Sequence, residues 1–220
     1  MELNRFIDHT LLSASATEAD VLKLCDDALK YNFYSVCVNS SYVALAKQAL
    51  SRSDVKVCTV VGFPLGAMST EAKIFEAKNA INQGASEIDL VMNIGRLKSK
   101  NYLAVLKDIS KVKQAIGLTT LKVILEISEL SKNEIVKACE ICMDAKADYV
   151  KTSTGFSKSG ATLTAVKIMK KTVRGQLEIK ASGGISDTET ALKYIEVGVS
   201  RIGASAGVEM MNNQLTNSSY

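Results

Sequence analysis

Two lysines occupy chemically unusual places in the chain. Lys151 ends the apolar run that begins at Tyr149, Lys180 ends the run that begins at Leu177, and small residues and glycine follow each lysine. Burying an ammonium group is costly unless it is paired or loses its proton. Two such lysines on neighbouring strands would disfavour each other's charge, and a neutral lysine amine attacks carbonyl groups to form a Schiff base. The alternative is that each side chain extends along its strand to solvent, which is the usual arrangement for a single strand-end lysine.

A carboxylate that could assist this chemistry lies inside another apolar run. Asp89 is in the stretch Glu87–Asn93, where an acid is costly without a partner that a nearby lysine would supply. We expect Asp89 to pass protons to and from a carbinolamine, or to hold Lys180 through a salt bridge. Glu126 and Asp148 are further acids near strand positions, and we expect ordinary structural roles for both.

The elements that must position these residues alternate regularly along the chain. Short apolar runs predict eight strands, over 5–11, 34–38, 55–61, 87–93, 121–127, 148–151, 177–180 and 200–203. Amphipathic stretches between them predict helices, including 41–50, 69–83, 100–116 and 162–173, and a last helix from about Gly207. Capping patterns at Thr17–Asp20, Ser131–Glu134 and Ser186–Glu189 predict helix starts. Eight β/α units without a linker indicate one α/β domain, a closed (β/α)8 TIM barrel over residues 1–211.

The predicted barrel also indicates where an anion would bind. Such barrels place reactive residues at the carboxyl ends of their strands and often bind phosphate with the loops after strands seven and eight. Gly183 and Gly184 follow strand seven, and Gly203-Ala204-Ser205 follows strand eight. Glycine loops present backbone N–H groups to an anion, so we predict a phosphate site there, although a Gly-Gly pair by itself indicates only a turn.

Composition excludes several classes of function. The net charge of +4 is spread along the chain and few residues are aromatic, which disfavours a nucleic-acid surface. Charged residues interrupt every apolar run, so no membrane span is expected. The five cysteines lack extracellular spacing and the amino terminus begins no signal peptide, so we expect a cytoplasmic protein. The one histidine, His9, excludes histidine triads and multi-histidine zinc sites. Cys139 and Cys142 fall in a helical pattern and are expected to pack.

Several motifs in order along the chain resemble the deoxyribose-phosphate aldolase family, whose members are class I aldolases with a (β/α)8 barrel. They are Ile7–Leu12, Val36–Asn39, Val60–Pro64, Glu87–Asp89, Leu121–Glu126, Val150–Phe156, Lys180–Ile185 and Arg201–Ser205. The resemblance implies reversible cleavage of 2-deoxy-D-ribose 5-phosphate to D-glyceraldehyde 3-phosphate and acetaldehyde, in deoxyribonucleotide catabolism, with no metal and no cofactor.

The resemblance also implies roles for individual residues. Lys151 matches the Schiff-base lysine, Lys180 the lysine that lowers its pKa, and Asp89 the acid of a proton relay. Cys37 matches a substrate-contacting cysteine, and four residues match phosphate-site positions of the family, namely Gly155, Gly183, Gly184 and Ser205. The implied partner is a small phosphosugar, with neither nucleic acid nor membrane, and a homodimer is an assembly to be tested.

Two positions near the carboxyl end carry separate expectations. Ala206 stands where the family pattern has a second serine, and the lost hydroxyl would weaken phosphate binding by about 1 kcal/mol unless backbone N–H groups make the contact. The polar tail 212–220 ends in Tyr220. Some family members end in a tyrosine that assists proton transfer, so Tyr220 is either part of a mobile end or a proton-relay residue.

Two other functions remain compatible with the sequence. A phosphosugar isomerase on the same barrel would use a carboxylate base and would not need a nucleophilic Lys151. A phosphosugar-binding protein without catalytic activity would bind the ligand and leave it intact. Borohydride trapping separates these functions from an aldolase, because only an iminium is reduced onto the protein.

Overall fold

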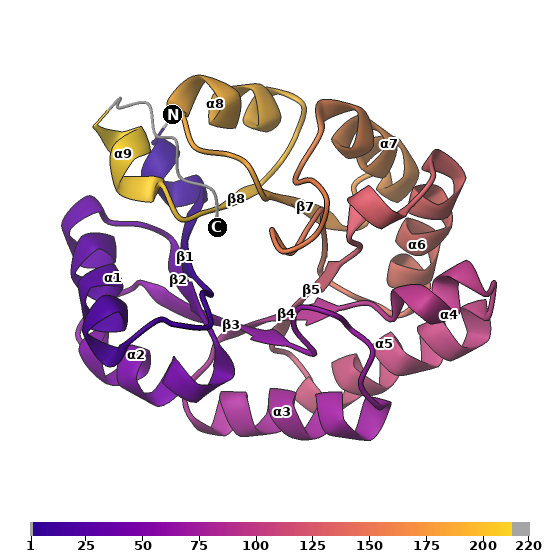
Figure 1. Cartoon of the computed structure of the whole chain (residues 1–220), viewed down its shortest axis with the longest axis horizontal. Coiled ribbons are helices and arrows are strands. Elements are labelled where there is room, and N and C mark those ends of the chain that lie inside the picture. Colours follow the sequence, from indigo (N-terminus) through magenta and orange to yellow (C-terminus); the bar gives the residue numbers. More distant parts are fainter. Residues whose placement is uncertain (1, 213–220) are drawn as a thin grey trace.

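The computed structural model describes residues 2–212, and in this range eight parallel strands close into a barrel in the order of the sequence. Helices surround the barrel on the outside (Figure 1), which confirms the predicted (β/α)8 fold. The strands are β1 (Ile7–Leu11), β2 (Ser35–Val38), β3 (Lys56–Val61), β4 (Glu87–Val91), β5 (Thr120–Ile124), β6 (Tyr149–Lys151), β7 (Glu178–Ser182) and β8 (Arg201–Ala204).

Each strand is followed by a helical segment. The α-helices are α1 (Glu18–Tyr31), α2 (Val43–Ala49), α3 (Thr70–Asn82), α4 (Ile94–Lys98), α5 (Tyr102–Ile116), α6 (Lys132–Asp144), α7 (Leu163–Val173), α8 (Thr188–Glu196) and α9 (Gly207–Met211). Three 3₁₀ turns, η1 (Leu3–Phe6), η2 (Ser40–Tyr42) and η3 (Ile127–Glu129), complete the described elements. None of the helices within residues 2–212 has the length and apolar character needed to span a bilayer.

Local capping explains where several helices begin. Thr17 and Asp20 form a capping box at α1, and Ser131 and Glu134 form another at α6, as predicted. The predicted start of α8 at Ser186 is wrong. Asp187 is the N-cap there, because its carboxylate accepts a hydrogen bond from the backbone N–H of Thr190.

Other differences from the predicted elements are small. The segment predicted as the start of the first strand forms η1, and the predicted helix 41–50 divides into η2 and α2. The short helix α4 was not predicted. It begins after Asn93, whose side chain accepts a hydrogen bond from the N–H of Arg96.

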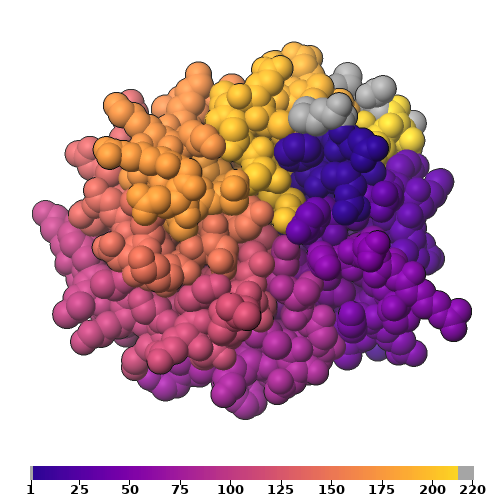
Figure 2. Space-filling model, turned by 180° about the vertical axis from the view of Figure 1, so that it is seen from behind, coloured from indigo at the N-terminus to yellow at the C-terminus, as the bar shows by residue number. Residues whose placement is uncertain are grey.

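Strand register aligns the charged residues of the barrel interior. Asp89 of β4 pairs with Lys122 of β5, Lys151 of β6 pairs with Lys180 of β7, and Lys180 pairs in turn with Arg201 of β8. Residues at one level of neighbouring strands point to the same side of the sheet, so the register brings these side chains into the barrel. Apolar side chains fill the layer between strands and helices. η1 lies beside α9, as the indigo and yellow segments of Figure 2 show from the opposite side.

Candidate active site

The carboxylate of Asp89 accepts hydrogen bonds from three lysines inside the barrel. Oδ2 of Asp89 accepts hydrogen bonds from Lys151 Nζ at 2.7 Å and from Lys180 Nζ at 2.9 Å, while Oδ1 accepts from Lys122 Nζ at 2.9 Å. All four side chains are at most 3% exposed. Because Lys151 and Lys180 contact the same oxygen, their nitrogens are neighbours inside the barrel, and the two residues lie on adjacent strands.

Further charged residues continue this network. Asp8 lies 2.5 Å from Lys180 Nζ and accepts a 2.8 Å hydrogen bond from Arg201, and Glu87 lies 2.6 Å from Lys122 Nζ and 3.4 Å from Arg201. Lys122, Asp8 and Arg201 were not predicted as site residues. The sequence could have indicated them, since each is a charged residue within or beside an otherwise apolar strand.

The network holds Asp89 and Asp8 in the ionised form. Burial opposes ionisation of Asp89, but the charges of Lys122, Lys151 and Lys180 outweigh it and hold the pKa of Asp89 well below its usual value. Burial likewise opposes ionisation of Asp8, and Lys180 and Arg201 outweigh it, so the pKa of Asp8 is also lowered. Both carboxylates therefore remain acceptors at neutral pH.

Two of the lysines are held in the charged form by the same interactions. Burial lowers the pKa of Lys180, yet the charges of Asp8 and Asp89 raise it above its ordinary value. Burial likewise lowers the pKa of Lys122, but Asp89 together with neighbouring groups outweighs burial and holds this pKa well above its ordinary value. Lys180 is thus a fixed cation beside Lys151.

The charges of the network do not balance. Its four cations face three carboxylates, namely Lys122, Lys151, Lys180 and Arg201 against Asp8, Glu87 and Asp89. Lys122, Lys180 and Arg201 each contact two of these carboxylates, whereas Lys151 contacts only Asp89. Among these four cations, Lys151 therefore has the fewest carboxylate contacts within the network.

Two cysteines border the network on neighbouring strands. Cys37 and Cys58 are register partners on β2 and β3, and the Cys58 thiol donates a 3.2 Å hydrogen bond to Asp89 Oδ1. Their sulfurs and an Asp89 oxygen lie within 4.8 Å of one another. This group is unsuited to a metal ion, because three ammonium groups surround Asp89 and burial raises the pKa of the Cys58 thiol well above its usual value.

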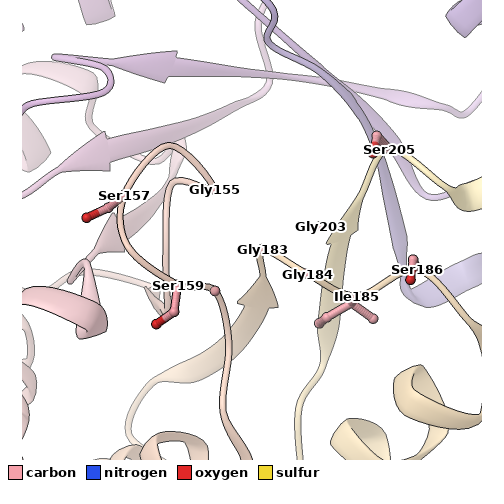
Figure 3. Close-up of a pocket in the computed structure, with 10 residues that line it drawn as sticks. Gly155, Ser157, Ser159, Gly183, Gly184, Ile185, Ser186, Gly203 and Ser205 are labelled. Atoms are coloured by element: carbon pink, nitrogen blue, oxygen red, sulfur yellow. The ribbon is translucent and has the colours of Figure 1, made fainter. Parts of the chain in front are cut away.

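A cavity of about 300 Å³ lies at the carboxyl ends of β6, β7 and β8, between the segments that follow these strands (Figure 3). Its lining residues are Gly155, Ser157, Ser159, Gly160, Gly183, Gly184, Ile185, Ser186, Gly203 and Ser205. The lining includes all four predicted phosphate positions and no cationic side chain. An anion in this cavity would be held by backbone N–H groups and hydroxyls rather than by an ion pair.

Glycine is required where the cavity loops approach each other. A Cβ on Gly160 would lie 2.0 Å from the carbonyl oxygen of Gly183, which accepts a hydrogen bond from the N–H of Ala161. A Cβ on Gly203 would lie 3.0 Å from Cε of Lys180. The small residues thus let the loops pack together and give the Lys180 side chain its space.

The other predicted positions lie as follows. Cys37 is on the opposite wall, in an apolar cluster near β1–β3, and does not line the cavity. Ala206 is buried at 2% exposure just before α9, and it is also not among the lining residues. Tyr220 lies outside the described residues, and so does the rest of the tail after Asn212.

Glu126 and Asp148, for which structural roles are expected, have hydrogen-bond partners on neighbouring elements or loops. Asp148 accepts hydrogen bonds from Lys113 and from the N–H of Leu121, at 2.6 and 2.7 Å. Glu126 is buried and accepts from the hydroxyl of Thr154, and burial raises its pKa above the ordinary value. Both acids tie strand ends together.

Comparison with known proteins places this architecture in a family. A protein from Finegoldia magna named deoxyribose-phosphate aldolase is 57% identical over 211 residues, covering 96% of this chain and 99% of that protein. One of the same name from Mycoplasmopsis pulmonis is 52% identical over all 220 residues of both chains. A crystal structure from Coccidioides immitis, provisionally named deoxyribose-phosphate aldolase, has a TM-score of 0.95 at 44% identity, covering 96% of this chain and 85% of the other. The model of the DeoC/LacD family aldolases matches residues 5–214, and the chain therefore belongs to this aldolase family.

Proposed function

We propose that this chain is a class I aldolase that reversibly cleaves 2-deoxy-D-ribose 5-phosphate to D-glyceraldehyde 3-phosphate and acetaldehyde, a step of deoxyribonucleotide catabolism. The observation that carries the proposal is the pair Lys151 and Lys180 on one oxygen of Asp89, beside a cavity suited to a phosphate. Membership of the aldolase family and the names of the relatives support it.

Lys151 is the proposed nucleophile. Its ammonium contacts one carboxylate of the network, whereas Lys180 is charged and bound between Asp8 and Asp89. Lys151 therefore has the fewest carboxylate contacts among the three lysines of the network. A neutral amine at Lys151 is what attack on an aldehyde requires.

The proposed reaction conserves atoms and charge as follows. The Lys151 amine adds to the C1 aldehyde of the open-chain sugar, and the carbinolamine loses water to form an iminium. Removal of the proton from the C3 hydroxyl breaks the C2–C3 bond, and its electrons enter the iminium to give an enamine and D-glyceraldehyde 3-phosphate. Protonation of the enamine at C2 and addition of water release acetaldehyde and restore the amine.

Asp89 is the proposed proton relay for these steps. It contacts Lys151 directly, and its lowered pKa makes it a weak base that passes a proton onward instead of retaining it. Lys180 is proposed to act as the neighbouring fixed cation and proton donor. The cavity around Gly155, Gly183, Gly184 and Ser205 would hold the phosphate, and Cys37 would contact the sugar.

Other features of the function are also proposals. We infer a reaction that needs neither metal nor cofactor, since a protonated imine supplies the electron sink. We retain the predicted cytoplasmic location, and a homodimer is one assembly to be tested. A relative from Aeropyrum pernix, 32% identical with a TM-score of 0.87, is described as a tetramer, so the assembly is to be measured in solution.

Borohydride reduction in the presence of 2-deoxy-D-ribose 5-phosphate or acetaldehyde tests the function directly. We expect one irreversible adduct, located at Lys151 by peptide mass spectrometry. Lys151→Met should abolish both the adduct and cleavage, whereas Lys158→Met, at an exposed lysine, should retain both. Product formation without an adduct would favour an isomerase-like carboxylate mechanism. Binding of the phosphosugar with neither adduct nor cleavage would favour a binding protein.

A further inference from the structure

Helix α3 contacts the carboxyl ends of several strands through two charged side chains one turn apart. Lys73 is fully buried, and Glu76 is half-buried. Positions three apart share one face of a helix, and this face is directed to the barrel. Neither residue contacts the lysine network of the site in any interaction that the structure gives for residues 2–212.

The Glu76 carboxylate joins the loops that follow β2 and β3. Its Oε1 accepts a 2.9 Å hydrogen bond from the hydroxyl of Ser40, and its Oε2 accepts a 2.9 Å hydrogen bond from the backbone N–H of Gly62. Hydrogen bonds to a carboxylate are stronger than those between neutral groups. One side chain therefore fixes two adjacent loops relative to each other.

The loop that Glu76 holds through Gly62 carries the aromatic side chain of Phe63. Gly62 has a φ of +66°, and its carbonyl accepts a 2.7 Å hydrogen bond from Gly66, which closes the loop. The next residue, Phe63, packs on a cluster formed by Leu12, Cys37, Cys58 and Val60. Cys58 in turn donates its hydrogen bond to Asp89. The position of Phe63 is thus linked by direct contacts to the proton relay.

Phe63 also contacts the loop that follows β6, the strand that ends at Lys151. The rings of Phe63 and Phe156 meet edge to face, with centroids 5.1 Å apart. Lys73 adds a second attachment of α3, because its Nζ donates to the carbonyl of Val91 at the end of β4 and pairs with Asp108 at 2.6 Å. Helix α3 therefore holds the ends of β2, β3 and β4 on the side of the site opposite the phosphate cavity.

We propose that Glu76 is a positioning residue of the aldol reaction, whose carboxylate holds Phe63 as an apolar wall over the reacting carbons. This inference rests on the proposed function. Carbon–carbon bond cleavage and formation need the enamine and the aldehyde in register, and a displacement of about 1 Å can cost two orders of magnitude in rate. Iminium formation on Lys151 with acetaldehyde needs only one small reactant and depends much less on that wall.

Two reactions of the same enzyme therefore distinguish positioning from folding. The first is phosphosugar cleavage, and the second is exchange of the methyl protons of acetaldehyde with D₂O, which requires the iminium and enamine but no second aldehyde. A loss of folded protein lowers both rates equally. A displaced wall lowers cleavage and leaves exchange nearly unchanged.

Three variants on α3 make the comparison. Glu76→Ala should lower kcat/KM for cleavage at least about tenfold and exchange less than about threefold. Glu76→Gln should recover most of the activity, because its carbonyl oxygen can accept from Gly62 while its amide donates to Ser40. Glu71→Ala, at an exposed acid on the same helix, should match the wild type in both reactions.

The experiment distinguishes failure of the positioning role of Glu76 from failure of the proposed aldolase function. Equal loss of cleavage and exchange in Glu76→Ala, or no loss of either, would overturn the positioning role. If Glu76→Ala does not fold, Glu76→Asp carries the test, because its shorter side chain cannot reach both loops and the same selective loss of cleavage is expected. Failure of the wild type to form any adduct at Lys151 would instead refute the proposed function, whatever the result for Glu76.

Discussion

Replacing Lys122 by methionine tests whether surplus positive charge in the barrel prepares the proposed nucleophile. Lys122 is fully buried and bridges Glu87 and Asp89, on the far oxygen of Asp89 from Lys151. Methionine keeps the length and apolar stem of the side chain and removes the charge. The network would change from four cations and three carboxylates to three of each.

The geometry sets the size of the effect. The Nζ atoms of Lys122 and Lys151 lie 2.9 and 2.7 Å from opposite oxygens of one carboxylate, and hence within about 8 Å of each other. At an effective dielectric constant of about 20, two unit charges at that separation repel by about 2 kcal/mol. Removing this repulsion should slow iminium formation at neutral pH by about thirtyfold.

The assay is the rate of borohydride-trapped adduct formation with acetaldehyde, followed from pH 6 to pH 10. Lys122→Met should be slower than the wild type at neutral pH and approach its rate at high pH, whereas Lys193→Met, at an exposed lysine of α8, should leave the profile unchanged. Lys122→Gln serves if the methionine variant is unstable. A folded Lys122 variant with an unshifted profile would refute the argument that the network's excess charge acts on Lys151.

Three further predictions follow from buried or terminal groups. Burial, opposed by Asp27, lowers the pKa of His9 to about 4, so the unfolded state binds a proton first as pH falls below 6.5. The free energy of unfolding should drop by about 2 kcal/mol between pH 7 and pH 5 from this group, and urea titrations of His9→Gln should lack that component. Asp108→Asn should cost about 3 kcal/mol by leaving the Lys73 ammonium unpaired, and the double variant Lys73→Met with Asp108→Leu should cost less; equal or greater loss would contradict this. Deleting Tyr220 should slow turnover far more than it weakens substrate binding, and equal turnover of the truncated chain would dismiss a role for that residue.

Much of the fold follows from local patterns in the sequence. Apolar runs separated by amphipathic stretches predict eight β/α units, and the capping residues Thr17 and Ser131 mark helix starts that the structure confirms. The predicted start of α8 was wrong because Ser186 and Asp187 are adjacent and both residue types can act as an N-cap. In the structure Asp187 is the N-cap. The four-residue turn η1 and the five-residue helix α4 are too short to give a periodic signal.

Some residues of the candidate site could also be predicted from the sequence, whereas others depend on the tertiary structure. Lys151, Lys180 and Asp89 are conspicuous in sequence because each is a charge in an apolar strand, and their meeting follows once the strands close into a barrel. Lys122 has the same local signature, but its place in the network depends on the register of β5 against β4. Glu76 gives no local signal, since an acid on a helix is ordinarily exposed.

The order of strands, the lysines in β6 and β7 and the glycines that line the cavity were determined by the sequence itself, because periodicity and residue type act over a few neighbouring positions. The prediction that Lys180 ends its strand is wrong, because it is the middle residue of β7. Tertiary structure alone decided which carboxylate each lysine contacts, which amine has the fewest anionic partners, and which helix holds the loop of Phe63. Those properties depend on distances between residues far apart in the chain, and electrostatic interactions change steeply over such distances inside a buried site.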